Sequence, residues 1–375
     1  MIKFWSYKKE FQKNKKEILL NIKKTMNSGN IFFGNQLINL EKNFKKKYNS
    51  KYGIAVGSGT DALLISLKAI GVKKGDEVIT VANTAIPTLS AIINSGAKPK
   101  LVDINNDYLM NLKQLKNLIN KKTKAIIPVH LYGQPCNMSE IVKISKKFNI
   151  DIIEDCAQAQ GAKFKNKYVG TFGRFGCFSF YPTKILGSYG DGGFILTNSY
   201  NDYKKIKRLR FYGIETENKK NKFFNKYYSN ENGFNSRLDE IQSTILNFKL
   251  KKVDQFINRR RFLAKLYIKE LSSTNLILPK ENMNCKHVYH LFTVYHNKRD
   301  KIIKNLNKKK IETKIIYPYP IHKMKGYKSI FKKNILLKNS EKKSKGIFSL
   351  PLYPELSNND LLTICKNLKN ILKII

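Results

Sequence analysis

One lysine of this sequence stands where its amine could do chemistry. Lys184 lies in the stretch FSFYPTKILGSYGDGG (178–193), after an aromatic run and a proline. Four glycines follow it before residue 194, and they indicate close backbone approaches that a surface lysine does not need. A lysine in such a pocket can form a Schiff base, because desolvation lowers the pKa of its amine. The alternative is a lysine whose stem packs while its ammonium reaches solvent.

An acidic residue ends a second apolar run, NIDIIED (149–155). Because Asp155 ends a buried strand, its charge is costly unless a cation lies nearby. The alternative is a helix N-cap, which is common after strands. Gln158 follows three residues later and is close enough to contact the same ligand.

A possible anion site follows the apolar run YGIAV (52–56). The next residues, GSGTDALLISLKAI (57–70), are two glycines and a threonine that open a helical pattern. A helix N-terminus offers unpaired backbone N–H groups and the positive end of the dipole. The stretch has no GxGxxG pattern and no Walker lysine. On its own it could be an ordinary strand–turn–helix junction.

Taken together, these three features describe a pyridoxal phosphate (PLP) site. The helix start suits the phosphate, Lys184 the aldehyde and Asp155 the pyridinium nitrogen. An acid that keeps the ring nitrogen protonated allows the ring to withdraw electrons from a substrate carbanion.

The elements that must position these groups form an alternating pattern. Such alternation predicts an α/β domain with a mostly parallel sheet that is covered on both faces. Ligands collect outside the carboxyl ends of such strands, which is where all three features lie. The expected strands are 52–56, 76–80, 98–104, 124–131, 149–155, 175–180 and 192–197, and the helices between the earlier ones are 60–70, 86–95, 111–120 and 138–148.

The rest of the chain suggests a second, smaller domain. Helices are expected at 8–28 and 36–48, and one long helical stretch, 237–271, leads out of the sheet region. Beyond it, 290–296 and 311–320 have the composition of strands. We therefore expect a large domain over residues 1–249 and a C-terminal α+β domain over 250–375.

Composition narrows the class of protein. The 375 residues are 42% hydrophobic, which indicates a globular chain, and no apolar run is long enough to cross a membrane. The N-terminus lacks the features of a signal peptide, so we expect a cytoplasmic protein. The cysteines form no CxxC pair, and they are interpreted as reduced structural thiols rather than metal ligands. They are Cys136, Cys156, Cys177, Cys285 and Cys365.

The formal charge of +44 would normally suggest a nucleic acid or an anionic membrane as partner. However, only eight of the 71 basic residues are arginine, and the lysines are spread from Lys3 to Lys373. This distribution argues against specific nucleic-acid binding, although a positive field would favour capture of small anionic substrates.

A family resemblance adds to this interpretation. In order and spacing, the chain resembles the sugar aminotransferases of the DegT/DnrJ/EryC1 family from about residue 30 to 355. The resemblance implies a fold-type-I aminotransferase, a homodimer with shared active sites that acts on nucleotide-linked keto sugars. The motifs are GSGTDALLISLKAIGVKKGDEVI, VHLYGQPCNMSEI, IEDCAQAQGA, FSFYPTKILGSYGDGG, GFNSRLDEIQ and IYPYPIH.

The resemblance also implies roles for individual residues. Lys184 matches the lysine that binds the cofactor aldehyde, Asp155 would pair with the pyridine nitrogen, and Gln158 would lie against the ring hydroxyl. Asn235 would reach the phosphate of the other subunit's cofactor. The same-subunit phosphate contacts would be the backbone N–H groups of Gly59, Thr60 and Asp61 and the Ser179 hydroxyl, and the sugar or diphosphate contacts would be Tyr181, Arg237, Tyr317 and His322. By itself, His322 would be interpreted as a surface histidine.

Two positions depart from the family pattern. Ala85 stands where members often carry an aromatic residue against the cofactor ring, and Arg174 stands where many have aspartate. The related dehydratases carry histidine in place of the lysine, so Lys184 argues against that branch.

The most specific expectation concerns the identity of the substrate. The HLYGQ and VANTAIPTLSAI segments look most like enzymes that aminate C3 of a dTDP-linked 3-keto-6-deoxyhexose, with glutamate as amino donor. The alternatives are C4 amination of a dTDP- or UDP-linked 4-keto sugar, another lysine-dependent outcome on sugars, and a regulatory or nucleic-acid-binding protein.

Overall fold

A seven-stranded sheet forms the centre of the large domain. The computed structural model describes residues 1–215, 227–331 and 335–375. The strands lie in the order β1-β9-β8-β5-β4-β2-β3, and only β9 runs antiparallel to its neighbours. Their bounds are β1 Tyr52–Val56, β2 Glu77–Val81, β3 Lys98–Val102, β4 Thr123–Ile126, β5 Asp151–Asp155, β8 Phe175–Ser179 and β9 Gly193–Thr197.

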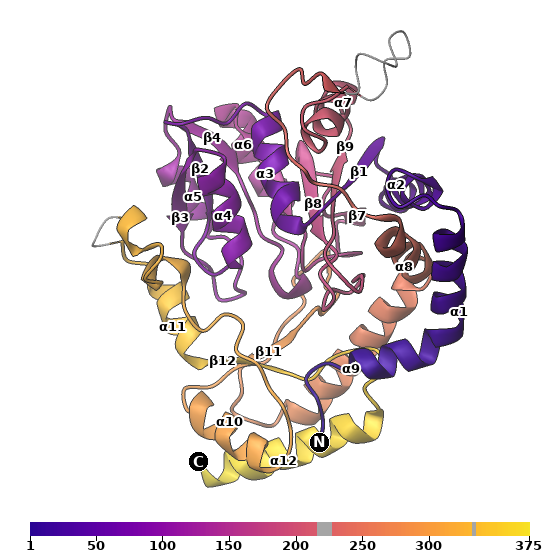
Figure 1. The fold of residues 1–375 in the computed structure, drawn as a ribbon. Helices are drawn as coiled ribbons and strands as arrows, with labels where there is room; N and C mark the ends of the chain where they lie inside the picture. Colours follow the sequence, from indigo (N-terminus) through magenta and orange to yellow (C-terminus); the bar gives the residue numbers. More distant parts are fainter. Residues whose placement is uncertain (216–226, 332–334) are drawn as a thin grey trace.

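Helices cover both faces of this sheet (Figure 1). One face packs against α3 (Gly59–Ala69), α4 (Ile86–Asn94) and α7 (Tyr200–Leu209), and the other against α5 (Leu112–Leu118) and α6 (Met138–Phe148). Successive residues of β5 alternate between the two cores: Ile153 belongs to the first and Ile152 to the second. The predicted α/β domain with a mostly parallel, doubly covered sheet is confirmed.

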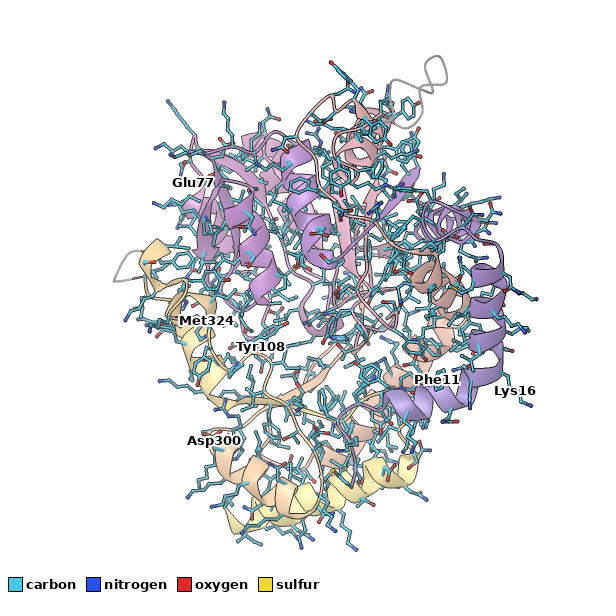
Figure 2. The ribbon with its side chains drawn as sticks, viewed as in Figure 1. Phe11, Lys16, Glu77, Tyr108, Asp300 and Met324 are labelled. Carbon is cyan, nitrogen blue, oxygen red and sulfur yellow. The ribbon has the colours of Figure 1, made fainter. Side chains whose placement is uncertain are left out.

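Three further helices flank the sheet beside β1. α1 (Tyr7–Asn27) and α2 (Asn35–Tyr48) pack against α8 (Glu240–Leu250). Glu240 fixes the start of α2, because its carboxylate accepts N–H bonds from Gly34, Gln36 and Leu37 at 2.8–3.0 Å. Phe11 faces this packing, whereas Lys16 points away from it (Figure 2).

The C-terminal domain is built of helices around a two-stranded sheet. β11 (Phe292–Tyr295) pairs with β12 (Ile347–Leu350). Around them, α9 (Val253–Leu271), α10 (Arg299–Lys308) and α12 (Asn358–Ile374) share one apolar core. The helix α11 (Lys338–Gly346) packs against α10 and leads directly into β12. A small third sheet joins the domains: β10 (Cys285–Lys286) pairs with β6 (Lys163–Phe164), which pairs with β7 (Lys167–Tyr168).

Two expectations about this half of the chain were wrong in detail. The stretch 237–271 is two helices, because the chain turns at Lys251–Lys252 between α8 and α9. Residues 311–320 form only isolated bridges, at Ile311 and Lys314, and the prolines at 318 and 320 remove the ladder N–H groups from the end of the segment. The N-terminal residues Ile2 and Trp5 pack against the same apolar core as the C-terminal helices.

The expected boundary near residue 249 stays a proposal, and the turn after α8 is the feature that supports it. Within the described ranges, no helix combines the length and the apolar character that crossing a membrane requires.

Candidate active site

Lys184 lies in a tight turn that follows β8. Its backbone N–H donates to the Tyr181 carbonyl at 2.8 Å, and the Ser188 hydroxyl donates to the Phe180 carbonyl at 2.9 Å. A Cβ on Gly187 would lie 2.4 Å from the Pro182 carbonyl oxygen, so only glycine allows the turn to close. The glycines therefore shape the turn that presents Lys184, as the sequence suggested.

The surroundings of Lys184 favour a neutral amine. The residue is half-buried, and desolvation lowers the pKa of its amine to about 8, although the Asp155 carboxylate opposes the shift. With that pKa about a tenth of the amine is neutral at pH 7, against about one part in 3,000 for an ordinary lysine. Lys184 is thus prepared to act as a nucleophile near neutral pH.

Asp155 is a buried carboxyl at the carboxyl end of β5. The Thr88 hydroxyl donates to its Oδ2 at 2.8 Å, and the Ala157 N–H donates to its Oδ1 at 3.1 Å. Burial nevertheless raises the pKa of Asp155, so the ionised form needs a cation beside it. No helix starts at this point, which removes the helix-cap alternative.

Gln158 links this strand end to the C-terminal domain. Its Oε1 accepts the Tyr132 N–H at 2.8 Å, and its Nε2 donates to the Tyr317 hydroxyl at 3.0 Å. Burial raises the pKa of Tyr317, and the nearby Asp155 charge adds to the shift. The structure therefore brings Asp155, Gln158 and Tyr317 together, and it adds Tyr132, which the sequence analysis did not select.

The start of α3 lies against the end of β8. A Cβ on Gly59 would be 2.6 Å from the Ser179 Cβ, so a glycine is required for this contact. The Ser58 hydroxyl caps the helix by accepting the Asp61 N–H at 3.0 Å. The N–H groups of Gly59 and Thr60 remain at the helix start for a phosphate, whereas the expected contribution of the Asp61 N–H is already used by this cap.

Asn235 and Arg237 lie on the segment that crosses this helix start. Between them, the Ser236 hydroxyl accepts the Gly57 N–H at 2.9 Å and donates to the Asp61 carboxylate at 2.8 Å. Asn235 itself is exposed. The Arg237 guanidinium stacks on the rings of Phe32 and Phe211, at 4.6 and 5.5 Å from their centroids.

The two remaining candidate substrate contacts have different surroundings. Tyr181 is 53% exposed, beside the turn that carries Lys184. His322 is buried, which contradicts its interpretation as a surface histidine, and its Nε2 pairs with Glu341 at 3.0 Å. The burial follows from Ile321, whose N–H donates to the Ala82 carbonyl and fixes the segment beside the start of α4. Contact of either residue with a substrate stays a prediction.

The structure shows where the two residues that depart from the family pattern lie. Arg174 lies at the opposite end of the sheet, where its guanidinium binds Asp202 at 2.7 Å and Asp151 at 3.2 Å. It therefore clamps β8 to β5 and α7, away from the strand ends that carry the site. Ala85 is the N-cap residue of α4, one turn before Thr88, and its small side chain leaves that helix end open.

A buried His130–Glu154–Cys156 cluster lies behind Asp155, with ligand atoms within 4.8 Å of one another. His130 Nδ1 accepts the Cys136 N–H at 3.0 Å, so the proton lies on Nε2, which pairs with Glu154 at 3.2 Å. Glu154 also accepts three backbone N–H bonds, from Gly170, Phe172 and Gly173. Both imidazole nitrogens are therefore engaged in hydrogen bonds. The cluster holds the surrounding backbone together and leaves no imidazole nitrogen free to bind a metal.

The fold and this site define a PLP-dependent aminotransferase. The profile of the DegT/DnrJ/EryC1/StrS aminotransferase family matches residues 12–369, and the chain belongs to that family. Its cofactor is PLP.

Individual relatives match along nearly the whole chain. The dTDP-3-amino-3,4,6-trideoxy-alpha-D-glucose transaminase of Micromonospora megalomicea subsp. nigra is 37% identical over 95% of this chain and 94% of its own. A "pleiotropic regulatory protein" of Geobacillus stearothermophilus is 38% identical over 92% of each chain. The solved structure of S. venezuelae DesV "in complex with ketimine intermediate" is 31% identical, with a TM-score of 0.94 over 98% of each chain.

The residues present fit this cofactor. When bound, PLP supplies an aldehyde for an amine and a ring that draws electrons from the substrate carbon. Lys184 would provide the amine, and its half-buried side chain would carry a proton to and from the reacting carbon. Asp155, whose carboxylate is oriented by Thr88 and Ala157, would hold a proton on the ring nitrogen. The start of α3 and Ser179 would bind the phosphate and so fix the position of the ring relative to Lys184.

Proposed function

We propose that the protein transfers an amino group to C3 of a dTDP-linked 3-keto-6-deoxyhexose, with L-glutamate as donor. The general activity, sugar aminotransfer, follows from the family and from the Lys184–Asp155 arrangement at the strand ends. The C3 position and the dTDP nucleotide are supported by the relative from Micromonospora, whose name describes a dTDP-3-amino sugar. The product would be the 3-amino-3,6-dideoxyhexose.

The observation that carries the enzymatic proposal is the pairing of a half-buried lysine, with a pKa of about 8, and a buried acid whose pKa is raised. A protein that only regulated or bound nucleic acid would need neither group. The name of the Geobacillus relative keeps a regulatory role as the alternative from a different class. It predicts binding without turnover, so a turnover assay separates the two.

The choice of sugar carbon predicts a substrate preference. The enzyme with PLP and L-glutamate should aminate dTDP-3-keto-6-deoxyglucose or its galactose epimer, and should turn over the dTDP-4-keto isomer at least about a hundredfold less efficiently. A misplaced keto carbon lies out of reach of the Lys184 amine, and misplacement by about 1 Å can already cost about a hundredfold in rate. The measurement is kcat/KM for each sugar, followed by 2-oxoglutarate release. If only the 4-keto sugar reacts, C4 amination replaces C3, while failure of every sugar counts against the whole proposal.

We also propose that the active unit is a homodimer with shared sites. Apolar side chains are exposed on α1 and on the segment that leads to α2, a pattern that favours a partner surface. They are Leu19, Leu20, Met26, Ile31, Phe32 and Phe33, each at least 38% exposed. Asn235 is exposed on the segment that packs beside them, where Arg237 stacks on Phe32.

The shared site predicts complementation between two inactive variants. Asn235→Ala and Lys184→Ala protomers, each inactive alone, should regain activity when subunits are mixed and allowed to exchange. One of the two sites in each heterodimer would then be wild type, so random exchange restores about a quarter of wild-type turnover. If Asn235 served its own protomer's cofactor, both sites of the heterodimer would be defective. No recovery despite subunit exchange shown by native mass spectrometry would therefore reject the shared site.

A further inference from the structure

A cavity of about 420 Å³ is lined by side chains from both the large and the C-terminal part of the chain, and neither Lys184 nor Asp155 is among them. Its walls come from the loop after β3, the turn at Leu131–Gln134, the segment after α9, and α11. Tyr108, from the loop after β3, lies on the side of the large domain that faces the C-terminal domain (Figure 2). The volume is within the range of about 300–1,000 Å³ that is typical of small-molecule sites.

Lys343 of α11 is a buried cation in the wall of this cavity. Its side chain is 8% exposed, and its Nζ lies 5.4 Å from the Tyr108 ring centroid and 5.2 Å from that of Tyr295. The two rings stabilise the charge but accept no conventional hydrogen bond. Among the residues that the structure describes, none forms an ion pair or a hydrogen bond with the Lys343 ammonium. Burial accordingly lowers the pKa of Lys343.

Gln134 presents a buried acceptor to the same cavity. Its Nε2 donates to the Lys280 carbonyl at 2.8 Å, which fixes the orientation of the amide. Its Oε1 is buried and finds no donor within the described part of the chain. A buried acceptor without a donor is destabilising, so a ligand that supplies a donor here gains affinity.

The nearby carboxylate of Asp107 is already partly used. Its Oδ2 accepts from the Asn282 amide at 2.8 Å, and its Oδ1 accepts the Leu109 N–H at 3.1 Å. The protein therefore fixes this carboxylate at the wall of the cavity. Its negative charge partly opposes the lowering of the Lys343 pKa, and it remains available to a cationic donor. Leu131 and Leu291 supply apolar surface between the polar groups.

We propose that this cavity binds a small α-amino acid, with its carboxylate on Lys343 and its ammonium toward Gln134 Oε1 and Asp107. A carboxylate satisfies the buried cation and an ammonium satisfies the buried acceptor, so one zwitterion completes both groups. An inorganic anion would satisfy only Lys343. The site does not depend on which sugar the enzyme aminates, because none of these residues was assigned to the cofactor or the sugar.

The position of Tyr132 couples the cavity to the cofactor site. Tyr132 lines the cavity, its N–H holds Gln158, and its hydroxyl donates to the Ile316 carbonyl at 2.6 Å, next to Tyr317. A ligand that packs on Tyr132 therefore contacts the residue that positions Gln158 and Tyr317. Occupancy of the cavity should change turnover without competing with the sugar.

Titration calorimetry on the borohydride-reduced holoenzyme tests the proposal, because reduction fixes the cofactor to Lys184 and prevents its exchange with added amines. The probes are L-glutamate, L-leucine and L-serine, with glutarate as the control that lacks the amino group. At least one amino acid should bind. For L-glutamate, removal of the amino group should weaken binding about tenfold, the effect of one lost hydrogen bond to a buried acceptor.

Substitutions within α11 locate the site. Lys343→Met, which keeps the length of the side chain and removes its charge, should weaken binding at least about tenfold. Lys342→Met, an exposed neighbour on the same helix, should leave binding unchanged. Where Lys343→Met does not fold, Gln134→Leu replaces it. The proposal is overturned if none of the three amino acids binds the wild-type protein, or if the affinity is the same after Lys343→Met, which would place the bound amino acid elsewhere.

Discussion

Replacement of Lys184 by alanine should abolish turnover, with a loss of at least about 10⁴-fold in kcat, and leave the fold intact. In the proposed site, the side chain would supply both the amine that holds the cofactor and the base that moves a proton at the reacting carbon. The turn that carries it is held by main-chain bonds at Tyr181 and Phe180, so alanine removes the chemistry without opening the turn.

Lys184→Arg should be as inactive as Lys184→Ala, although it keeps the positive charge. A guanidinium stays protonated at any working pH and offers no attacking amine, whereas the Lys184 amine has a pKa of about 8. Single-turnover transamination and the loss of the yellow, borohydride-sensitive absorbance are the measurements. Lys121→Ala, at an exposed lysine on the turn before β4, is the matched control and should match the wild type. Near-normal single turnover by Lys184→Ala would contradict the assignment.

The strand ends could be predicted from the sequence because two separate signals agreed there. Each apolar run stopped at a polar or glycine residue, and parallel strands bring such ends to one edge. The location of Lys184, Asp155 and Gly59 at the strand ends could therefore be predicted without any knowledge of side-chain contacts. The same reasoning failed for 311–320, where apolar residues suggested a strand although only isolated bridges form and prolines stand at the end of the segment. It also missed the break at Lys251–Lys252, because the turn carries no glycine or proline to mark it.

The residues that orient the site could not be predicted in this way. Thr88 donates to Asp155 across 67 positions of sequence, and Ser236 joins Gly57 and Asp61 across even longer separations. Threonine and serine are common on helices and in loops, so their types carry no signal until the fold brings them to their partners. His322 is a further example, because the sequence suggested a surface residue. Only the packing of Ile321 against Ala82 reveals that the imidazole is buried.

Asp155→Asn should lower kcat at least about 10³-fold, by removing the charge and leaving the shape of the side chain unchanged. Burial raises the pKa of Asp155, so its ionised form depends on a nearby cation. The protonated ring nitrogen of a bound cofactor would be that cation. An asparagine can still accept the Ala157 N–H through its Oδ1, and its Nδ2 can donate to the Thr88 hydroxyl oxygen, but it does not hold a proton on that nitrogen. Asp155→Ala should lose as much activity, and Asp155→Glu should be impaired because its carboxylate is displaced.

The matched control for Asp155 lies on the same strand. Asp151 begins β5 at the opposite edge of the sheet, where its carboxylate binds Arg174 at 3.2 Å. Asp151→Asn should keep near-normal kcat and lose only the small stability of a partly exposed ion pair, about 1 kcal/mol or less. Bound cofactor, measured by absorbance, should remain in Asp155→Asn because the start of α3 would still hold the phosphate. Slow turnover with the cofactor retained in Asp155→Asn, beside normal turnover in Asp151→Asn, would separate electrostatic control of the ring from a general defect in β5. Unchanged turnover in Asp155→Asn would show that the carboxylate only organises the turn through Thr88 and Ala157.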